Sequence, residues 1–245
     1  MRKLFVAVAV AVAVAVAAML AVGLTGCASD ASAPKSIVAL DTAEHDGPYP
    51  RAWFDTAYKN GARLFILQDV DWGTCTPWPT AKSQFQLALN AGFKIAAYTR
   101  DPSCWSGGVK AASGLKLQFF VIDIETTGTS GQATHYTTAQ VQSYVNGVTA
   151  AGVRPVIYTG ADMWSGLMGG NVTAFSKVPL WDADAGVVKA PKQTALASWA
   201  NVSTPALRAF GGWNTASNPR VAVQQVLDYT LDGKVVDLSS FNASF

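Results

Sequence analysis

Short apolar runs alternate with longer amphipathic segments along most of this chain, and this pattern predicts strands followed by helices. The first two thirds hold five such pairs. We expect their strands at Ile37–Thr42, Leu64–Val70, Lys94–Thr99, Gln118–Glu125 and Arg154–Thr159. We expect their helices at Arg51–Asn60, Thr80–Ala91, Val109–Gly114, Thr138–Ala151 and Ala161–Leu167. Strands that alternate with helices favour parallel pairing.

The last third of the chain follows a different pattern. Val178–Asp184, Val221–Val226 and Val235–Leu238 are typical of strands, but full-length helices do not follow them. Eight strands, of which the first five carry crossover helices, indicate the α/β class. We expect an irregular TIM-type (β/α) barrel with five βα units followed by three strands with few helices.

The run Phe119–Glu125 ends in two carboxylates one residue apart. Side chains alternate across a strand, so Asp123 and Glu125 are expected on the same side with Cβ atoms roughly 6.5–7 Å apart. Hydrolysis of a sugar acetal uses two carboxyl groups about 5–9.5 Å apart. The alternative is that these acids are solvated or cap the next helix.

Two further acids support an active site at the barrel's end. In barrels of this type the active-site residues come from the carboxyl ends of strands. We expect Asp41, Asp123, Glu125 and Asp237 all to lie at such ends.

The amino terminus is typical of an export signal. Arg2 and Lys3 precede an apolar tract that ends in Leu24-Thr25-Gly26-Cys27, which resembles a bacterial lipobox. We therefore expect residues 1–26 to be a lipoprotein signal peptide and Cys27 to be lipidated and membrane-anchored. Residues 27–34 would be a tether, and residues 35–245 the barrel domain, outside the cytoplasm. An uncleaved membrane helix is the alternative.

The balance of charged residues bears on which classes of partner the chain can bind. The whole chain has 18 basic and 16 acidic residues, and loss of Arg2 and Lys3 with the signal would leave 16 of each. A formally neutral domain lacks the basic surface that nucleic acid requires, so no nucleic-acid partner is expected. The oligomeric state stays open, with a monomer as our expectation.

Cys75 and Cys104 remain once Cys27 is assigned to the anchor. An even pair outside the cytoplasm favours a disulfide, although two free thiols are the alternative. Neither cysteine belongs to a Cys/His cluster with metal-ligand spacing, and Glu44-His45-Asp46 is typical of a solvated loop. We expect neither a metal nor a cofactor.

The strand ends together resemble glycoside hydrolase family 25, the lysozyme-like N-acetylmuramidases. Val38-Ala39-Leu40-Asp41 matches the first strand of that family, and Asp123-Ile124-Glu125 matches its fourth. Four later segments follow in the family's order: Pro155-Val156-Ile157-Tyr158-Thr159, Leu180-Trp181, Gln224-Gln225 and Val236-Asp237-Leu238-Ser239-Ser240-Phe241. The resemblance implies a barrel of five βα units and three strands.

The resemblance also implies roles for these residues. Glu125 would be the general acid, and Asp123 would stabilise either the substrate's N-acetyl group as nucleophile or a covalent intermediate. Asp41 and Asp237 would bind the sugar. We add five candidate substrate-binding residues: Tyr98, Tyr158, Gln225, Trp72 and Trp105. The two tryptophans are included because indoles stack on sugar rings, although tryptophan more often packs in a core.

Two departures from the family bear on the substrate. Gln68-Asp69-Val70-Asp71-Trp72 and Asp182-Ala183-Asp184-Ala185 replace the residues that the family usually has after strands two and six. The expectation is a cell-envelope hydrolase that cleaves β-linked N-acetylated sugars in peptidoglycan. The alternatives are a hydrolase of another envelope polysaccharide and a glycan-binding lipoprotein without activity.

Overall fold

The computed structural model describes residues 36–125, 133–183, 188–189, 196, 207–214 and 220–245, all within one compact unit, Lys35–Phe245. The expected signal peptide, Cys27 and the tether lie outside the described residues. No helix in the described part of the chain is long and apolar enough to cross a membrane.

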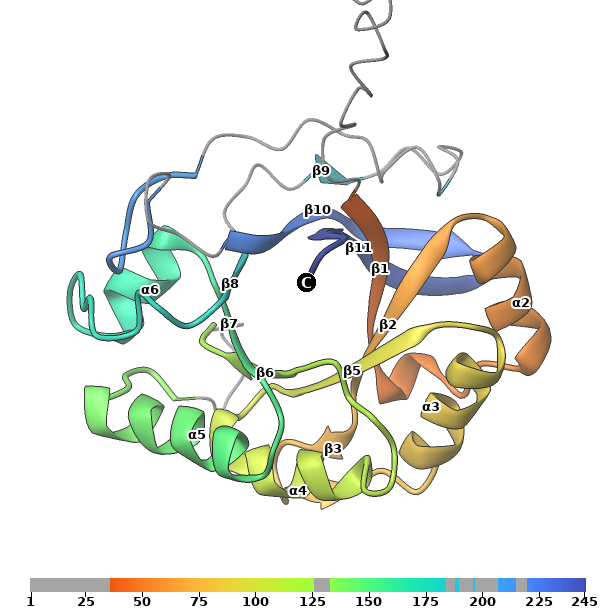
Figure 1. Cartoon of the computed structure of the whole chain (residues 1–245), viewed down its shortest axis with the longest axis horizontal. Coiled ribbons are helices and arrows are strands. Elements are labelled where there is room, and N and C mark those ends of the chain that lie inside the picture. The colour runs from red at the N-terminus through yellow and green to blue at the C-terminus, as the bar shows by residue number, and fades with distance from the viewer. Residues whose placement is uncertain (1–35, 126–132, 184–187, 190–195, 197–206, 215–219) are drawn as a thin grey trace, which may run out of the picture. The chain divides into compact units, whose positions relative to one another are not determined.

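Eight strands close into a ring, with helices around its outside (Figure 1). The ring strands are β1 (Ser36–Ala43), β2 (Ala62–Gln68), β5 (Lys94–Thr99), β6 (Phe120–Asp123), β7 (Pro155–Thr159), β8 (Leu180–Asp182), β10 (Arg220–Leu231) and β11 (Lys234–Asn242). Neighbours from β1 to β10 pair in parallel, and β11 closes the ring antiparallel to β10 and β1. The expected irregular (β/α) barrel is confirmed.

Five α-helices are described, and they lie close to their predicted bounds. They are α2 (Arg51–Lys59), α3 (Ala81–Asn90), α4 (Trp105–Ala111), α5 (Thr138–Ala150) and α6 (Ala161–Leu167). Only α4 differs by more than a residue, because it begins at Trp105 rather than Val109. Two short 3-10 turns, η1 (Glu44–Asp46) and η2 (Pro102–Cys104), follow β1 and β5. The sequence pattern did not predict the short strands β3 (Val70–Asp71), β4 (Thr76–Pro77) and β9 (Val188–Lys189).

Local chemistry explains where the helices begin and end. Thr137 caps α5: its hydroxyl oxygen accepts from the Gln140 N–H, and the Gln140 side chain accepts from the Thr137 N–H at 2.8 Å. Gly152 follows the C-cap of α5 with φ +77°, a conformation that glycine adopts without a Cβ clash.

Apolar layers lie on both faces of the sheet. One outer layer packs α2, α3 and α4 against the strands through Phe54, Phe65 and Phe85, all fully buried. A second packs α5 and α6 through Val141, Ile157 and Trp164. Because the strands from β2 to β8 are covered on both faces, their sequences are nearly continuous apolar runs rather than alternating ones.

Three phenylalanines fill the inside of the barrel at the amino-terminal end of its parallel strands. Phe119 stacks on Phe241 with ring centroids 5.3 Å apart, and Phe245 lies 5.4 Å from Phe119. The Arg154 guanidinium covers the Phe245 ring at 3.8 Å. This end is therefore closed by packed rings, which leaves the opposite end for a binding cavity.

One strand direction differs from expectation. Asp237 was expected at the carboxyl end of its strand, but β11 begins at Lys234 and runs antiparallel, so Asp237 lies near its start. It reaches the predicted edge because of this reversal: Asp237 pairs directly with Asp41 of β1.

The disulfide between Cys75 and Cys104 is present, as predicted from the pair that remains once Cys27 is assigned to the anchor. It ties the turn between β3 and β4 to η2, across 29 residues of chain. We expect reduction to lower the free energy of unfolding by about 3–4 kcal/mol, because a loop of this length frees chain entropy in the unfolded state. Urea denaturation with and without reductant measures this, and a Cys75→Ala/Cys104→Ala variant should show no response to reductant.

Candidate active site

A cavity of about 610 Å³ opens at the carboxyl-terminal end of the parallel strands. Four acids expected from the sequence line it: Asp41 of β1, Asp123 of β6, Glu125 just after β6, and Asp237 of β11. Asp46 and Asp228 line it as well. Val121 lines it too, so Val121, Asp123 and Glu125 share one face, as strand periodicity predicts. The expected convergence of the four acids is confirmed.

The backbone between the two central acids is held by β7. The Ile124 N–H donates to the Tyr158 carbonyl at 2.9 Å, and the Thr159 hydroxyl donates to the Ile124 carbonyl at 2.8 Å. These bonds extend the strand pairing beyond Asp123, so Glu125 follows directly from a fixed segment. Its side chain is 18% exposed, which leaves it accessible to a ligand in the cavity.

Asp41 and Asp123 have too few hydrogen bonds to offset the cost of burying their carboxylates. Asp123 is 2% exposed, and one carboxylate oxygen of each residue is buried without a hydrogen-bond partner among the described residues. Burial raises the pKa of both carboxyls well above the usual range; Asp237 adds to the rise for Asp41, and Glu125 adds to it for Asp123. Both groups therefore lose their protons at higher pH than exposed carboxyls do.

Opposing influences act on Glu125. Burial raises its pKa above the ordinary value, the Arg100 guanidinium lowers it, and Asp237 raises it. Arg100 Nη2 lies 3.7 Å from Glu125 Oε1. A carboxyl whose pKa is raised in this way keeps its proton at higher pH, which is the form that a general acid needs.

Asp237 is oriented by two polar groups, one of which is held in turn by Tyr158. Its Oδ1 accepts from the Asp228 N–H at 2.9 Å, and Gln224 Nε2 lies 3.4 Å from its Oδ2. Tyr158 donates its hydroxyl to the Gln224 amide oxygen at 2.7 Å. Burial raises the pKa of Asp237 to about 6, although the Asp228 N–H opposes the shift. Asp228 lies where β10 leaves regular register and has φ +57°, so a bulge aims this N–H.

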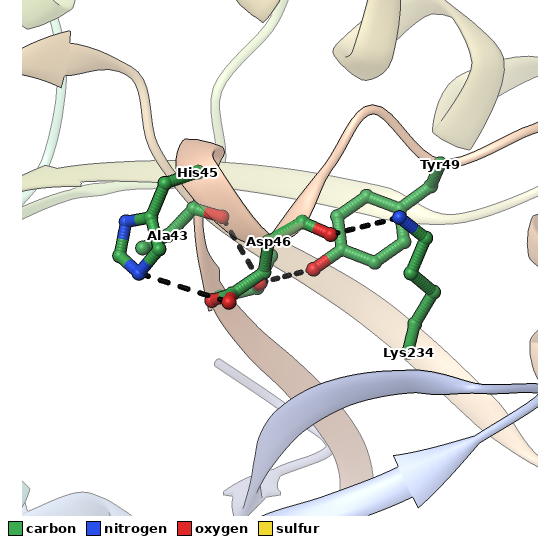
Figure 2. A network of polar contacts seen from close by, with 6 residues as sticks. Ala43, His45, Asp46, Tyr49 and Lys234 are labelled. Carbon is green, nitrogen blue, oxygen red and sulfur yellow. Dashed lines mark hydrogen bonds and ion pairs between the residues drawn. The ribbon is translucent and has the colours of Figure 1, made fainter.

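The rim beside β1 is tied to β11 through the network in Figure 2. Lys234 donates to the Asp46 carbonyl at 3.0 Å, and its ammonium lies 5.5 Å from the centre of the Tyr49 ring. The Tyr49 hydroxyl bonds the Thr42 hydroxyl, and His45 Nε2 lies 3.7 Å from Asp46 Oδ1. These contacts fix the chain that leaves β1, where His45 and Asp46 line the cavity. No group of three or more potential metal ligands is arranged for an ion within the described ranges.

Some of the other candidate binding residues line the cavity and some do not. Tyr98 and Tyr158 line the cavity, as expected. Gln225 does not: the neighbouring Gln224 lines it, whereas Gln225 is 7% exposed and its amide nitrogen has no partner among the described residues. Gln224 and not Gln225 is the member of the pair that lines the cavity, because successive residues of a strand face opposite sides.

Trp72 and Trp105 do not line the cavity either. The chain after β2 turns outward into β3 and β4, which contact α4 outside the ring (Figure 1). Trp72 lies in that turn, and Trp105 packs against the outer core from α4. Neither tryptophan therefore contributes to this cavity, and Trp105 has the packing role that is more frequent for tryptophan.

The packing of Trp105 leads to a prediction about the stability of the fold. A Cβ at Gly147 of α5 would lie 2.3 Å from Trp105 Cζ2, closer than atoms can approach. Gly147→Ala is therefore expected to reduce the free energy of unfolding by about 1–3 kcal/mol, despite alanine's better helix propensity. Thermal denaturation tests this beside Gly166→Ala in α6, where no atom lies within 4 Å of the added Cβ. Equal stability of the two variants would contradict the packing described.

Sequence reasoning missed Arg100, Trp181, Gln224 and Asp228, all of which line the cavity. Arg100 directly follows β5, so the rule that selected the acids would have found it. Trp181 is 2% exposed and donates its indole N–H to the Ser239 hydroxyl at 3.0 Å, which supports the cavity wall. The role of Asp228 depends on a bulge in β10 that the sequence pattern does not predict.

Comparisons with known proteins agree with this architecture. The model of the family "Glycosyl hydrolases family 25" matches residues 107–204, which include Asp123, Glu125 and Tyr158. No curated protein sequence matches the chain.

Among solved structures, the CTP1L endolysin is similar with a TM-score of 0.60 and 17% identity, over 85% of this chain and 67% of that one. The activity of that endolysin is regulated by a secondary translation product. A sugar phosphate isomerase/epimerase from Parabacteroides distasonis matches with a TM-score of 0.32 and 12% identity, over 56% of this chain and 55% of that one. The first likeness supports the fold, and the family match supports a glycosidase of lysozyme-like type.

Proposed function

We propose that this chain is a lysozyme-like glycoside hydrolase that cleaves β-linked N-acetylated sugars in peptidoglycan, with Glu125 as general acid. The observation that carries the proposal is the convergence of Asp41, Asp123, Glu125 and Asp237 on one cavity. The family match over residues 107–204 supports the same chemistry. A cavity of about 610 Å³ also falls within the usual size range of small-molecule sites.

In this proposal the protonated Glu125 gives its proton to the glycosidic oxygen as the bond to the anomeric carbon breaks. Positive charge then develops on the sugar, and Asp123 stabilises it directly or through the substrate's N-acetyl group. Asp41 and Asp237 bind sugar hydroxyls along the β1–β11 side. Burial raises the pKa of Glu125, Arg100 opposes the rise and Asp237 adds to it, and the raised pKa favours retention of the Glu125 proton.

Incubation of the chain with insoluble peptidoglycan tests this function, with bound protein and released soluble glycan both measured. Release together with binding supports the hydrolase. Binding without release, at every pH from about 4 to 8, would favour the glycan-binding alternative. Absence of both would reject any role on this polymer.

We also propose that Cys27 carries a lipid anchor, which would confine the enzyme to wall near its own membrane. The support is the sequence Leu24-Thr25-Gly26-Cys27 after an apolar tract. Cys27→Ser is expected to abolish lipid labelling of the protein. Unchanged labelling, or wild-type protein found mainly in the culture medium, would contradict the anchor.

A further inference from the structure

Arg100 is a cation placed among acids and lacks good hydrogen-bond partners. It follows β5 at the cavity edge, and its side chain is 28% exposed. Its contact with Glu125, at 3.7 Å, is too long for a hydrogen bond. Among the residues that the structure describes, the guanidinium makes no hydrogen bond, although it has five N–H donors in a planar fork.

The acids around Arg100 are poor counter-ions under the conditions in which the enzyme would work. Arg100 acts electrostatically on Asp123, Glu125 and Tyr98. The other titratable groups that line the same cavity are Asp41, His45, Asp46, Tyr158, Asp228 and Asp237. Burial raises the pKa of Asp41 and Asp123, which makes them weaker counter-ions than exposed carboxylates, although Arg100 itself lowers the pKa of Asp123. Glu125 must be protonated to act as the acid, and it then loses the charge that faces Arg100.

A guanidinium is a permanent cation, and a partly buried one that makes no hydrogen bond among the described residues is poorly compensated. The substrate can supply the missing anion. A carboxylate matches the guanidinium fork and can accept two parallel hydrogen bonds from it. Since Arg100 lies beside Glu125, that carboxylate would belong to a sugar next to the bond that is cleaved.

We propose that Arg100 is a specificity-determining residue that binds a free carboxylate of the glycan. This inference rests on the proposed hydrolase function and narrows its substrate class. The carboxylate has two sources: the lactyl group of muramic acid in wall glycan whose stem peptides have been removed, or a uronic acid in another envelope polysaccharide. Intact peptidoglycan, in which the lactyl group forms an amide, would be the weaker ligand.

Calorimetric binding to the full chain in detergent separates this inference from catalysis. The probes are the disaccharide N-acetylglucosaminyl-N-acetylmuramic acid, its methyl ester, a hyaluronan tetrasaccharide and neutral chitotetraose. We expect the free acid to bind at least about tenfold more tightly than its ester, the scale of a charged bidentate contact. A preference for the hyaluronan fragment over chitotetraose would identify the uronic acid source.

Arg100→Gln should bring the acid and ester to nearly equal affinity, and Arg100→Lys should restore only part of the preference, because it keeps the charge without the fork. Arg51→Gln on α2 is the matched control, since Arg51 pairs with Asp55 outside the cavity. Equal binding of acid and ester by the wild type, or a preference that survives in Arg100→Gln, would overturn the inference.

Cleavage assays give the second readout. The two substrates are intact peptidoglycan and glycan strands from which the stem peptides have been removed. The kcat/KM for the stripped strands divided by that for intact peptidoglycan should fall at least about tenfold in Arg100→Gln. If the wild type cleaves neither but still prefers the free acid in binding, the hydrolase proposal fails and the role of Arg100 stands. If it cleaves both equally and Arg100→Gln keeps that ratio, the role of Arg100 fails and the hydrolase stands.

Discussion

Glu125→Gln is expected to slow glycan cleavage by about 10²-fold or more, because an amide cannot give up the proton that a general acid supplies. The substitution keeps the size of the side chain, so binding of the glycan should change far less than kcat. Asp55→Asn on α2 is the matched control: it also removes one carboxylate charge, but from an exposed helical ion pair outside the cavity. A rate within a few-fold of wild type for Glu125→Gln would remove Glu125 from the mechanism.

The same residue sets the expected pH profile. A general acid works while protonated, so activity should fall as the pH rises through its pKa. Burial raises the pKa of Glu125 above its ordinary value of 4.5, with Arg100 opposing and Asp237 adding to the shift. The alkaline limb should therefore lie above pH 4.5, and Arg100→Gln should move it further upward.

Asp123→Asn is expected to have two opposite effects. Cleavage should fall by about 10²-fold or more, because a group that stabilises charge in the transition state is replaced by a neutral amide. Stability should rise at neutral and alkaline pH, because a buried carboxyl without a partner for one oxygen, among the described residues, is removed.

The direction of the stability effect follows from linkage. The folded-state pKa of Asp123 is raised well above its ordinary value of 3.8, so its stabilising contribution is fully present below about pH 3.8 and is lost as the pH rises through the folded-state pKa. The melting temperature of the wild type should fall as the pH rises from 3.8 through the folded-state pKa of Asp123, whereas that of Asp123→Asn should fall less. Thermal denaturation from pH 4 to 8 measures this, and parallel curves for the two proteins would contradict it.

Most of the barrel could be predicted because its strands are buried on both faces. Continuous apolar runs such as Lys94–Thr99 have few other stable positions in a fold of this size, and the bounds of β5 match their prediction. The capping box at Thr137 likewise fixes the start of α5 locally. Predictions succeeded where local sequence and burial act together.

The site was predicted less completely, because its details depend on contacts between distant strands. Asp41 and Asp237 are neighbours only through an antiparallel pairing that closes the ring, and sequence periodicity does not reveal strand direction. The choice between Gln224 and Gln225 depends on strand register, in which one residue's shift reverses the face. Trp72 lies outside because the β3–β4 hairpin leads the chain away from the cavity.

The most direct test of the account is the release of new reducing ends from purified peptidoglycan by the full chain, measured beside Glu125→Gln from pH 4 to 8. The account predicts release by the wild type that falls on the alkaline side, and a rate lower by about 10²-fold or more in the variant at every pH. Release by both proteins at equal rates would contradict the assignment of Glu125. No release by either protein, with wall binding intact, would contradict the central claim that this barrel is a peptidoglycan hydrolase.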